Sequence, residues 1–268
     1  MVLREPGRCY CIFDIPFSPN VLFSFFVKHS YYLFAVFLLV GGQPAAAQTA
    51  RDQAEARTLY HQANAAPASA NLRAAMARQS SGFFGDGTFQ RGALRTYDGR
   101  YRPVPGLRFH AGLHLLEAQD SVEVDSTHLW PVGSLRGFDL GETDDTRPAL
   151  RRFRTRLVKE GSAGSRREFV EVLTAVDAGP LLLAWLHASG ADATAGRLSL
   201  VPLLLVGAGN APTEPLRPLE LNQTAVLRLF GARGGDVQAF ATTNRLHFDQ
   251  AVDVARMIDH YNRVAVVK

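Results

Sequence analysis

Apolar and polar residues alternate along the middle of the chain, from about residue 82 to residue 206. In the segment LRFHAGLHLLEA, the odd positions from 107 to 115 are apolar, and the even positions include Arg108, His110 and His114. A period of two is typical of a strand with one buried face and one solvated face. Similar short segments, separated by glycine-rich turns such as Asp86-Gly87 and Asp98-Gly99, predict about seven to nine strands at the spacing of an all-β body.

Two later segments are apolar without alternation and predict strands that are buried on both faces. They are Leu181–Leu186 and Leu198–Val206, and Pro202 places the second at an edge or a bulge. The segment RRFRTRLV alternates instead, with Arg152, Arg154 and Arg156 at every second position. We interpret these arginines as the solvated face of a strand.

Residues 48–81 and 221–268, on either side of the strand-rich region, follow a helical pattern. Residues 48–81 are rich in alanine and predict an arm of two helical pieces on either side of Pro67, loosely packed or partly ordered. Residues 207–220 contain several prolines and glycines and predict a linker. In 221–268 the helical period returns, with Asn222 as a possible cap and Gly231 as a stop. Its last helix carries an apolar stripe: Val252, Ala255, Met257, Ile258 and Tyr261.

These patterns together predict an α+β protein. We expect an antiparallel, β-rich body at 82–206 and a helical C-terminal segment packed on it. A meander, a sandwich and a barrel all fit the spacing of the strands, and the sequence leaves these three open.

The most apolar run of the chain, Tyr31–Val40, has the features of an export signal. Lys28 and His29 precede it, the helix-breaking sequence Gly41-Gly42-Gln43-Pro44 follows it, and Ala45-Ala46-Ala47 supplies an A-x-A cleavage pattern. A signal core needs roughly 7–15 apolar residues, whereas a membrane span needs about 20. We therefore expect cleavage between Ala47 and Gln48.

A retained membrane anchor is the alternative. It would join Val21–Val27 to the apolar run and bury Lys28 within the span, where a cation costs about 2.5–3.5 kcal/mol. We favour the cleaved signal, at residues 27–47. Residues 1–26 show no helical period, and we interpret them as an upstream extension from a misassigned start, with translation beginning near Val27.

Composition narrows the chemistry of the mature chain. The only two cysteines of the full sequence, Cys9 and Cys11, precede the expected cleavage site, so the mature chain has none. We therefore expect no disulfide, no thiolate nucleophile and no cysteine-ligated zinc. Of the 29 basic and 25 acidic residues, three and two precede the cleavage site, which leaves a net charge of +3. This charge is too weak to indicate a nucleic-acid partner.

No pattern of a metal or cofactor site stands out. His110 and His114 are four residues apart, and on one strand they would lie about 13 Å from each other, at ~3.3 Å per residue. The acidic cluster Glu142, Asp144 and Asp145 lacks the spacing of a calcium loop, and we interpret it as a solvated turn. We expect no cofactor and no metal.

Several phrases of the chain resemble a loose group of exported bacterial proteins of unknown function. The phrases are GLRFHAGLHLLEAQD, GSLRGFDL, REFVEVLTAVDAGPLLLAW, and a tail that runs from LRLFG through VQAFATTNRLHF to DVARMIDHYN, with Tyr261-Asn262 at its end. The resemblance covers about 180 residues at low identity. It implies a signal peptide, a β-rich body and a short helical tail, and it carries no activity.

We expect an exported protein, in the periplasm, at the outer membrane or outside the cell, without a stable membrane span after processing. A non-catalytic module that binds an envelope macromolecule or stabilises the surface is the first hypothesis. A carrier of a small apolar ligand in a β-barrel is the second. An exported hydrolase is the third, and it requires some of these residues to converge in one cleft: His128, Ser134, Asp139, Glu142 and Asp144.

Overall fold

Ten antiparallel strands form one sheet in the computed structural model, which describes residues 45–120, 122, 126–141, 150–159, 161, 164–192 and 197–266. The chain divides into two compact units, Met1–Gln48 and Thr49–Lys268. The apolar run Tyr31–Val40, both cysteines, Glu142, Asp144 and Asp145 lie outside the described residues.

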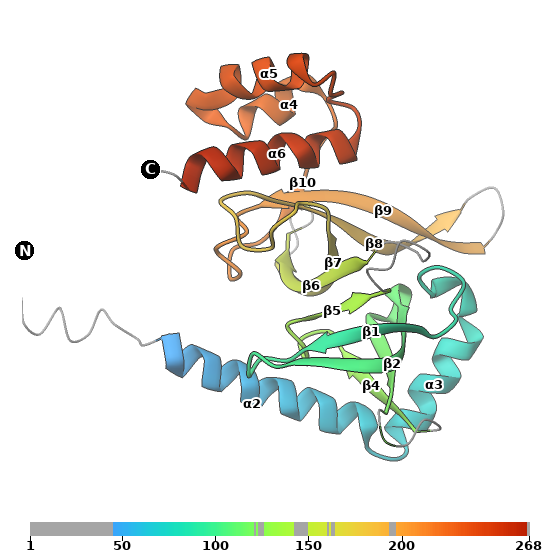
Figure 1. Ribbon diagram of the computed structural model, residues 1–268. Coiled ribbons are helices and arrows are strands. Elements are labelled where there is room, and N and C mark those ends of the chain that lie inside the picture. Colours follow the sequence, from blue (N-terminus) through green and yellow to red (C-terminus); the bar gives the residue numbers. More distant parts are fainter. Residues whose placement is uncertain are drawn as a thin grey trace, which may run out of the picture. The chain divides into compact units, whose positions relative to one another are not determined.

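The sheet consists of two meanders that meet at β1 and β5 (Figure 1). Its order is β10-β9-β8-β7-β6-β5-β1-β2-β3-β4. The strands are β1 (Gln90–Arg95), β2 (Tyr101–His110), β3 (Leu115–Gln119), β4 (Thr127–Pro131), β5 (Gly137–Leu140), β6 (Arg151–Val158), β7 (Arg166–Val172), β8 (Leu182–Asp192), β9 (Arg197–Gly207) and β10 (Arg217–Pro218). The α+β class with an antiparallel, β-rich body is therefore confirmed.

Helices precede and follow the sheet. The helices α2 (Ala45–Asn64) and α3 (Ala68–Arg78) lie on either side of Pro67, and the 3₁₀ turn η1 (Ser80–Gly82) leads into the sheet. The C-terminal helices are α4 (Gln223–Arg228), the 3₁₀ turn η3 (Gly231–Arg233), α5 (Gly234–Thr243) and α6 (Ala251–Val266). Asn222 caps α4, since its side chain accepts a hydrogen bond from the Ala225 amide.

The apolar run in β8 is buried on both faces, as the sequence indicates. Leu183 and Trp185 pack with the C-terminal helices, next to Leu204 and Val206 of β9. Leu182, Ala184 and Leu186 point to the other face, where they meet Val158, Val170 and Leu216. This two-sided packing attaches α4–α6 to the sheet, and Figure 1 shows the three helices grouped beside β8 and β9.

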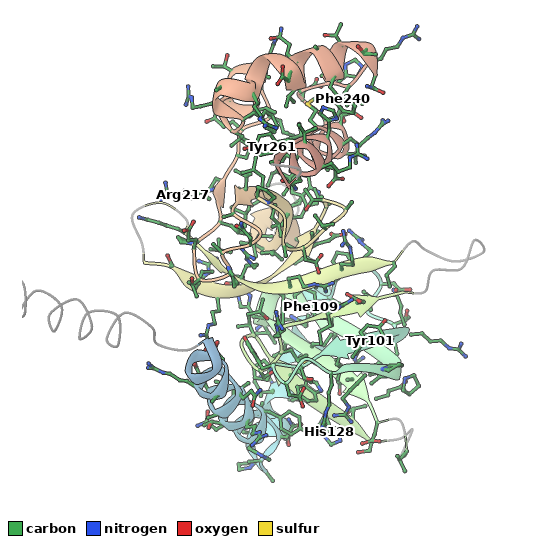
Figure 2. The ribbon with its side chains drawn as sticks, turned by 60° about the vertical axis from the view of Figure 1, so that its left-hand side comes forward. Tyr101, Phe109, His128, Arg217, Phe240 and Tyr261 are labelled. Carbon is green, nitrogen blue, oxygen red and sulfur yellow. The ribbon has the colours of Figure 1, made fainter. Side chains whose placement is uncertain are left out.

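A cluster of aromatic rings fills the other half of the sheet. Four buried rings form it: Phe109, Phe138, Phe153 and Phe169. Phe109 and Phe138 each contact the other three, and Phe138 stacks on Phe153 with centroids 4.6 Å apart. Figure 2 shows Phe109 among the strands, whereas Phe240 and Tyr261 lie among the C-terminal helices. The rings occupy this half of the body as a packed core.

The expectation of one strand through LRFHAGLHLLEA is wrong. Strand β2 ends at His110, the 3₁₀ turn η2 (Ala111–Leu113) follows, and β3 begins at Leu115. His114 adopts the left-handed conformation that closes this turn, with φ of 54°. The apolar alternation continues through the turn because Ala111 and Leu115 are buried on both sides of it, and periodicity alone could not detect the break.

His110 is buried and not solvated, which also differs from the expectation. Its Nε2 lies 2.7 Å from the Gln79 carbonyl, and its Nδ1 accepts a hydrogen bond from the Leu113 amide at 3.1 Å. The two bonds fix the neutral tautomer with the proton on Nε2. Burial lowers the pKa of His110 below its ordinary 6.5.

The arginines of β6 are a second correction. Arg154 and Arg156 are 8% and 5% exposed, and Arg152 is partly buried, so this is not the solvated face of a strand. The apolar stripe of α6 also differs in detail, because Val252 is exposed and Val254 takes the buried position. Pro202 lies in β9 outside the two residues that pair with β10, consistent with an edge position.

Acidification should destabilise the protein through His110. The folded state disfavours the protonated ring and the unfolded state does not, so stability is lost as the pH falls through 6.5. We expect the unfolding free energy from urea titrations to fall between about pH 7 and pH 5, and to fall less steeply in His110→Asn, which has no proton to take up. Equal slopes in the two proteins would contradict this assignment.

Candidate functional site

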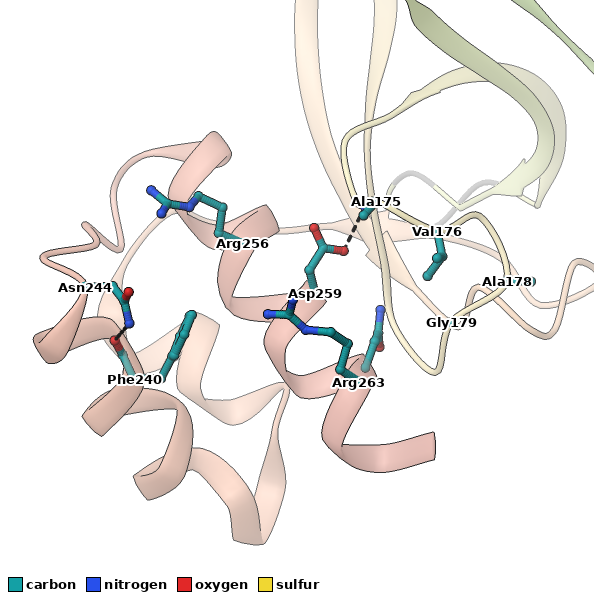
Figure 3. A pocket seen from close by; sticks show the side chains of 10 residues that line it. Ala175, Val176, Ala178, Gly179, Phe240, Asn244, Arg256, Asp259 and Arg263 are labelled. Carbon is teal, nitrogen blue, oxygen red and sulfur yellow. Dashed lines mark hydrogen bonds between the residues drawn. The ribbon is translucent and has the colours of Figure 1, made fainter. Parts of the chain in front are cut away.

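A pocket of about 1070 Å³ opens between the loop that joins β7 to β8 and the helices α5 and α6 (Figure 3). We call it the loop–helix pocket. The loop contributes Ala175, Val176, Ala178 and Gly179, and the helical side contributes Phe240, Asn244, Arg256, Asp259, Asn262 and Arg263. Its wall is largely apolar, with charged groups only on α6.

Helix α6 holds the loop through two polar side chains. Asn262 is buried, and its amide accepts from the Leu181 amide at 2.9 Å and donates to the Leu181 carbonyl at 2.8 Å. Gly179 lies so close that a Cβ there would meet Asn262 Nδ2 at 2.5 Å, which explains why this position is glycine. Asp259 accepts a hydrogen bond from the Ala175 amide at 2.8 Å (Figure 3).

Strand β6 holds the same loop from the sheet. Arg152 donates to the carbonyls of Thr174 and Ala175 and to Asp177. Arg154 also binds Asp177, and it pairs with the buried Asp139 at 2.7 Å. The guanidinium groups thus occupy backbone and carboxylate acceptors of the loop, and a buried cation needs such partners.

A third arginine ties the neighbouring loop to this arrangement. Arg156 donates to the carbonyls of Ala208, Gly209 and Ala211. The Asn210 amide in turn donates to the Gly179 carbonyl at 3.0 Å. The residues that we expected to form a linker are therefore bonded to the sheet and to the pocket loop.

The helical wall of the pocket is formed by aromatic packing. Phe240 of α5 stacks on His260 of α6, with centroids 3.9 Å apart and an interplanar angle of 6°. Phe230 and Tyr261 also lie in contact, at 5.2 Å. These contacts fix α5 against α6, so both walls of the pocket are formed before any ligand binds.

The charged residues of the pocket follow one face of α6. Arg256, Asp259 and Arg263 are spaced three and four residues apart, and Figure 3 shows all three on the pocket side of the helix. Burial raises the pKa of Asp259, and Arg263 partly offsets the shift. Arg256 lies 3.8 Å from Asp253, and within the described part of the chain Arg263 has no ion pair.

The residues of the hydrolase hypothesis have separate partners. Asp139 is buried between Arg95 and Arg154, His128 lies 3.3 Å from Asp120, and Ser134 donates to the Pro131 carbonyl. No hydrogen bond or ion pair joins Asp139, His128 and Ser134 in the described residues. Glu142 and Asp144 lie outside them, and so does any contact they make.

The structure also gives the places of the expected cleavage site and of the two histidines considered for a metal site. Ala47 and Gln48 lie in the first turn of α2, and Gln48 is the last residue of the first of the two units. The His114 ring pairs with the buried Glu168 at 2.6 Å, away from His110 and its own partners. Across the described residues, no group of three histidine, cysteine or acidic side chains is placed to hold a metal ion.

The described side chains of the two apolar runs of the sequence, Leu181–Leu186 and Leu198–Val206, do not line the loop–helix pocket. Leu181–Leu186 and residues 203–206 pack instead in the clusters on either face of β8 and β9, whereas Leu200 packs against the aromatic cluster and Val201 is exposed. Among the helices that the structure describes, none combines the length and apolar character that crossing a membrane requires.

Comparison with models of protein families, with curated proteins and with solved structures gives no match to this chain.

Sequence reasoning missed most of the pocket residues. In the sequence, Asn262 stands out only as part of the terminal Tyr-Asn pair, and no pattern assigns a role to Asp259 or Arg263. The available signal was the segment DAGP before an apolar strand, since Gly179 marks a close approach of another group.

Removing the Asn262 amide should loosen the pocket loop. Asn262→Ala leaves the Leu181 amide and carbonyl without these partners, and we expect a loss of about 1–3 kcal/mol in unfolding free energy. Hydrogen exchange should rise in residues 174–181. Asn244→Ala is the control, because its side chain bonds only the exposed end of α5 and should cost less than about 0.5 kcal/mol. Equal effects of the two substitutions would contradict the assigned role of Asn262.

Proposed function

We propose that this chain is an exported, non-catalytic binding module of the bacterial cell envelope, and that it binds its ligand in the loop–helix pocket. The observation that carries the proposal is the pocket itself, a largely apolar hollow with walls fixed by hydrogen bonds and ring stacking. A pre-formed site binds without an added cost for ordering its walls.

The volume of the pocket bears on the choice between the two partners expected from the sequence. Sites for small ligands usually measure about 300–1,000 Å³ and are lined mainly by apolar groups. At about 1070 Å³, the loop–helix pocket lies just above this range. This supports a small, mostly apolar ligand over an envelope macromolecule. The proposed binding site is the pocket between the loop and α6 and not the interior of a barrel.

The N-terminal sequence supports export. The apolar run, its preceding cation and the alanine pattern occur in the order of a signal peptide. The boundary of the second compact unit, at Thr49, falls one residue after the expected mature N-terminus.

Cleavage should depend on Ala47 and not on its neighbour. The residue before the cut must be small, while the middle position of the A-x-A pattern is free. In a bacterial export host we expect the mature protein to begin at Gln48, Ala47→Tyr to block cleavage, and Ala46→Tyr to be processed normally. N-terminal sequencing and intact mass measure this. Residues 1–20 in the exported product, or normal processing of Ala47→Tyr, would contradict the proposed signal.

A charge in the pocket should abolish apolar binding. Val176 lines the pocket and is 50% exposed, and Val201 on β9 is 52% exposed outside it. With the purified full chain and the neutral fluorescent probe N-phenyl-1-naphthylamine, we expect saturable binding that falls about tenfold or more in Val176→Asp, because the carboxylate must be desolvated. Val201→Asp should bind as the wild type does. Absence of binding by the wild type, or equal binding by the two variants, would refute the proposed function.

A further inference from the structure

We infer that the ligand of the loop–helix pocket is a linear amphiphile with one carboxylate, such as a free fatty acid. This inference rests on the proposed function and specifies its ligand. The alkyl chain lies along Val176, Ala178 and Phe240, and the carboxylate binds Arg263 at the α6 side of the pocket.

The backbone of the pocket loop favours an alkyl chain over a peptide. The Ala175 amide binds Asp259 and its carbonyl binds Arg152, while the carbonyls of Val176 and Gly179 accept from Thr174 and Asn210. The side chain of Asn262 forms hydrogen bonds with both the amide and the carbonyl of Leu181. A bound peptide brings an amide and a carbonyl at every residue, and each must find a partner when it leaves water. Methylene groups need none. The loop groups that are already bonded offer a peptide no partner, so this wall suits an alkyl chain.

The charges of α6 favour an anionic head group. The pocket is lined by two arginines and one carboxylate, Arg256, Arg263 and Asp259, which leaves one net positive charge. Asp259 is already bonded to the loop, and Arg256 lies near Asp253. Arg263 is exposed and has no ion pair among the described residues, so its guanidinium fork is available to a carboxylate.

The single net charge also limits the head group. A fatty-acid carboxylate carries one negative charge, which matches the pocket, whereas a doubly charged phosphate would bring its second charge close to Asp259. A cationic head group would meet two arginines. The pocket therefore discriminates by charge at one end and by apolar contact along the rest.

The test compares head groups on one alkyl chain. Dodecanoate and dodecylamine below their micellar concentrations, and dodecan-1-ol below its solubility limit, compete with N-phenyl-1-naphthylamine for the purified full chain. We expect dodecanoate to displace the probe at about tenfold lower concentration than the alcohol, the size of one charge-assisted contact. The amine should bind more weakly than the alcohol.

Three variants assign the effect to α6. Arg263→Gln should weaken dodecanoate about tenfold and leave dodecan-1-ol unchanged, since only the charged contact is lost. Asp259→Asn should strengthen dodecanoate, because it removes a repelling charge while the amide oxygen can still accept from Ala175. Arg228→Gln, an exposed arginine of α4 outside the pocket, should change neither ligand.

The outcomes separate the two proposals. If the probe binds as predicted but dodecanoate and dodecan-1-ol compete equally, the carboxylate inference fails and the binding function stands. If Arg263→Gln weakens the acid and the alcohol alike, the charged contact is also refuted. If the wild type binds no probe, the proposed function fails first.

Discussion

The need of three guanidinium groups on β6, two buried and one partly buried, for oxygen partners determines how the pocket loop and the segment after β9 are held. Arg152, Arg154 and Arg156 occupy alternate positions of β6, so all three point to one face of the sheet. Two of them are almost fully buried, and a buried cation without partners is strongly unfavourable. Loop carbonyls and Asp177 meet this need, except at Nε of Arg156, which has no partner among the described residues. The bonds that satisfy the arginines therefore also fix the pocket loop and the segment after β9.

Two asparagines supply partners in the same way to backbone groups of the sheet. Asn64, the last residue of α2, bonds both the amide and the carbonyl of Leu129 in the edge strand β4. Asn262 of α6 bonds both groups of Leu181 in the same way, just before β8 begins. A carboxamide has one donor side and one acceptor, as a peptide group does, and it can replace a missing neighbouring strand. Each asparagine thus attaches a helix to the sheet at one defined register.

The class of fold could be predicted because the spacing of apolar residues along the chain indicates which faces are buried. The continuous apolar run of β8 correctly indicated two covered faces, and Asn222 and Pro67 marked helix boundaries through local chemistry. The sequence could not predict the pairing of β1 with β5, which depends on contacts between distant residues. It also misread the arginines of β6 and the histidine at position 110, since a polar residue at an alternating position is buried or solvated according to partners that lie elsewhere in the chain.

The same limitation explains why the pocket escaped prediction. Its loop wall depends on arginines of β6, its helical wall depends on the packing of α4–α6 against Leu183, Leu204 and Val206, and neither is visible within the residues that line it. The two walls are nonetheless coupled, because Asn262 and Asp259 belong to the helix and bond the loop. A ligand in the pocket would contact an apolar surface whose two sides are kept at a fixed spacing by these bonds. Persistent apolar exposure of this kind is costly for an isolated chain, and it is retained where a binding partner covers it.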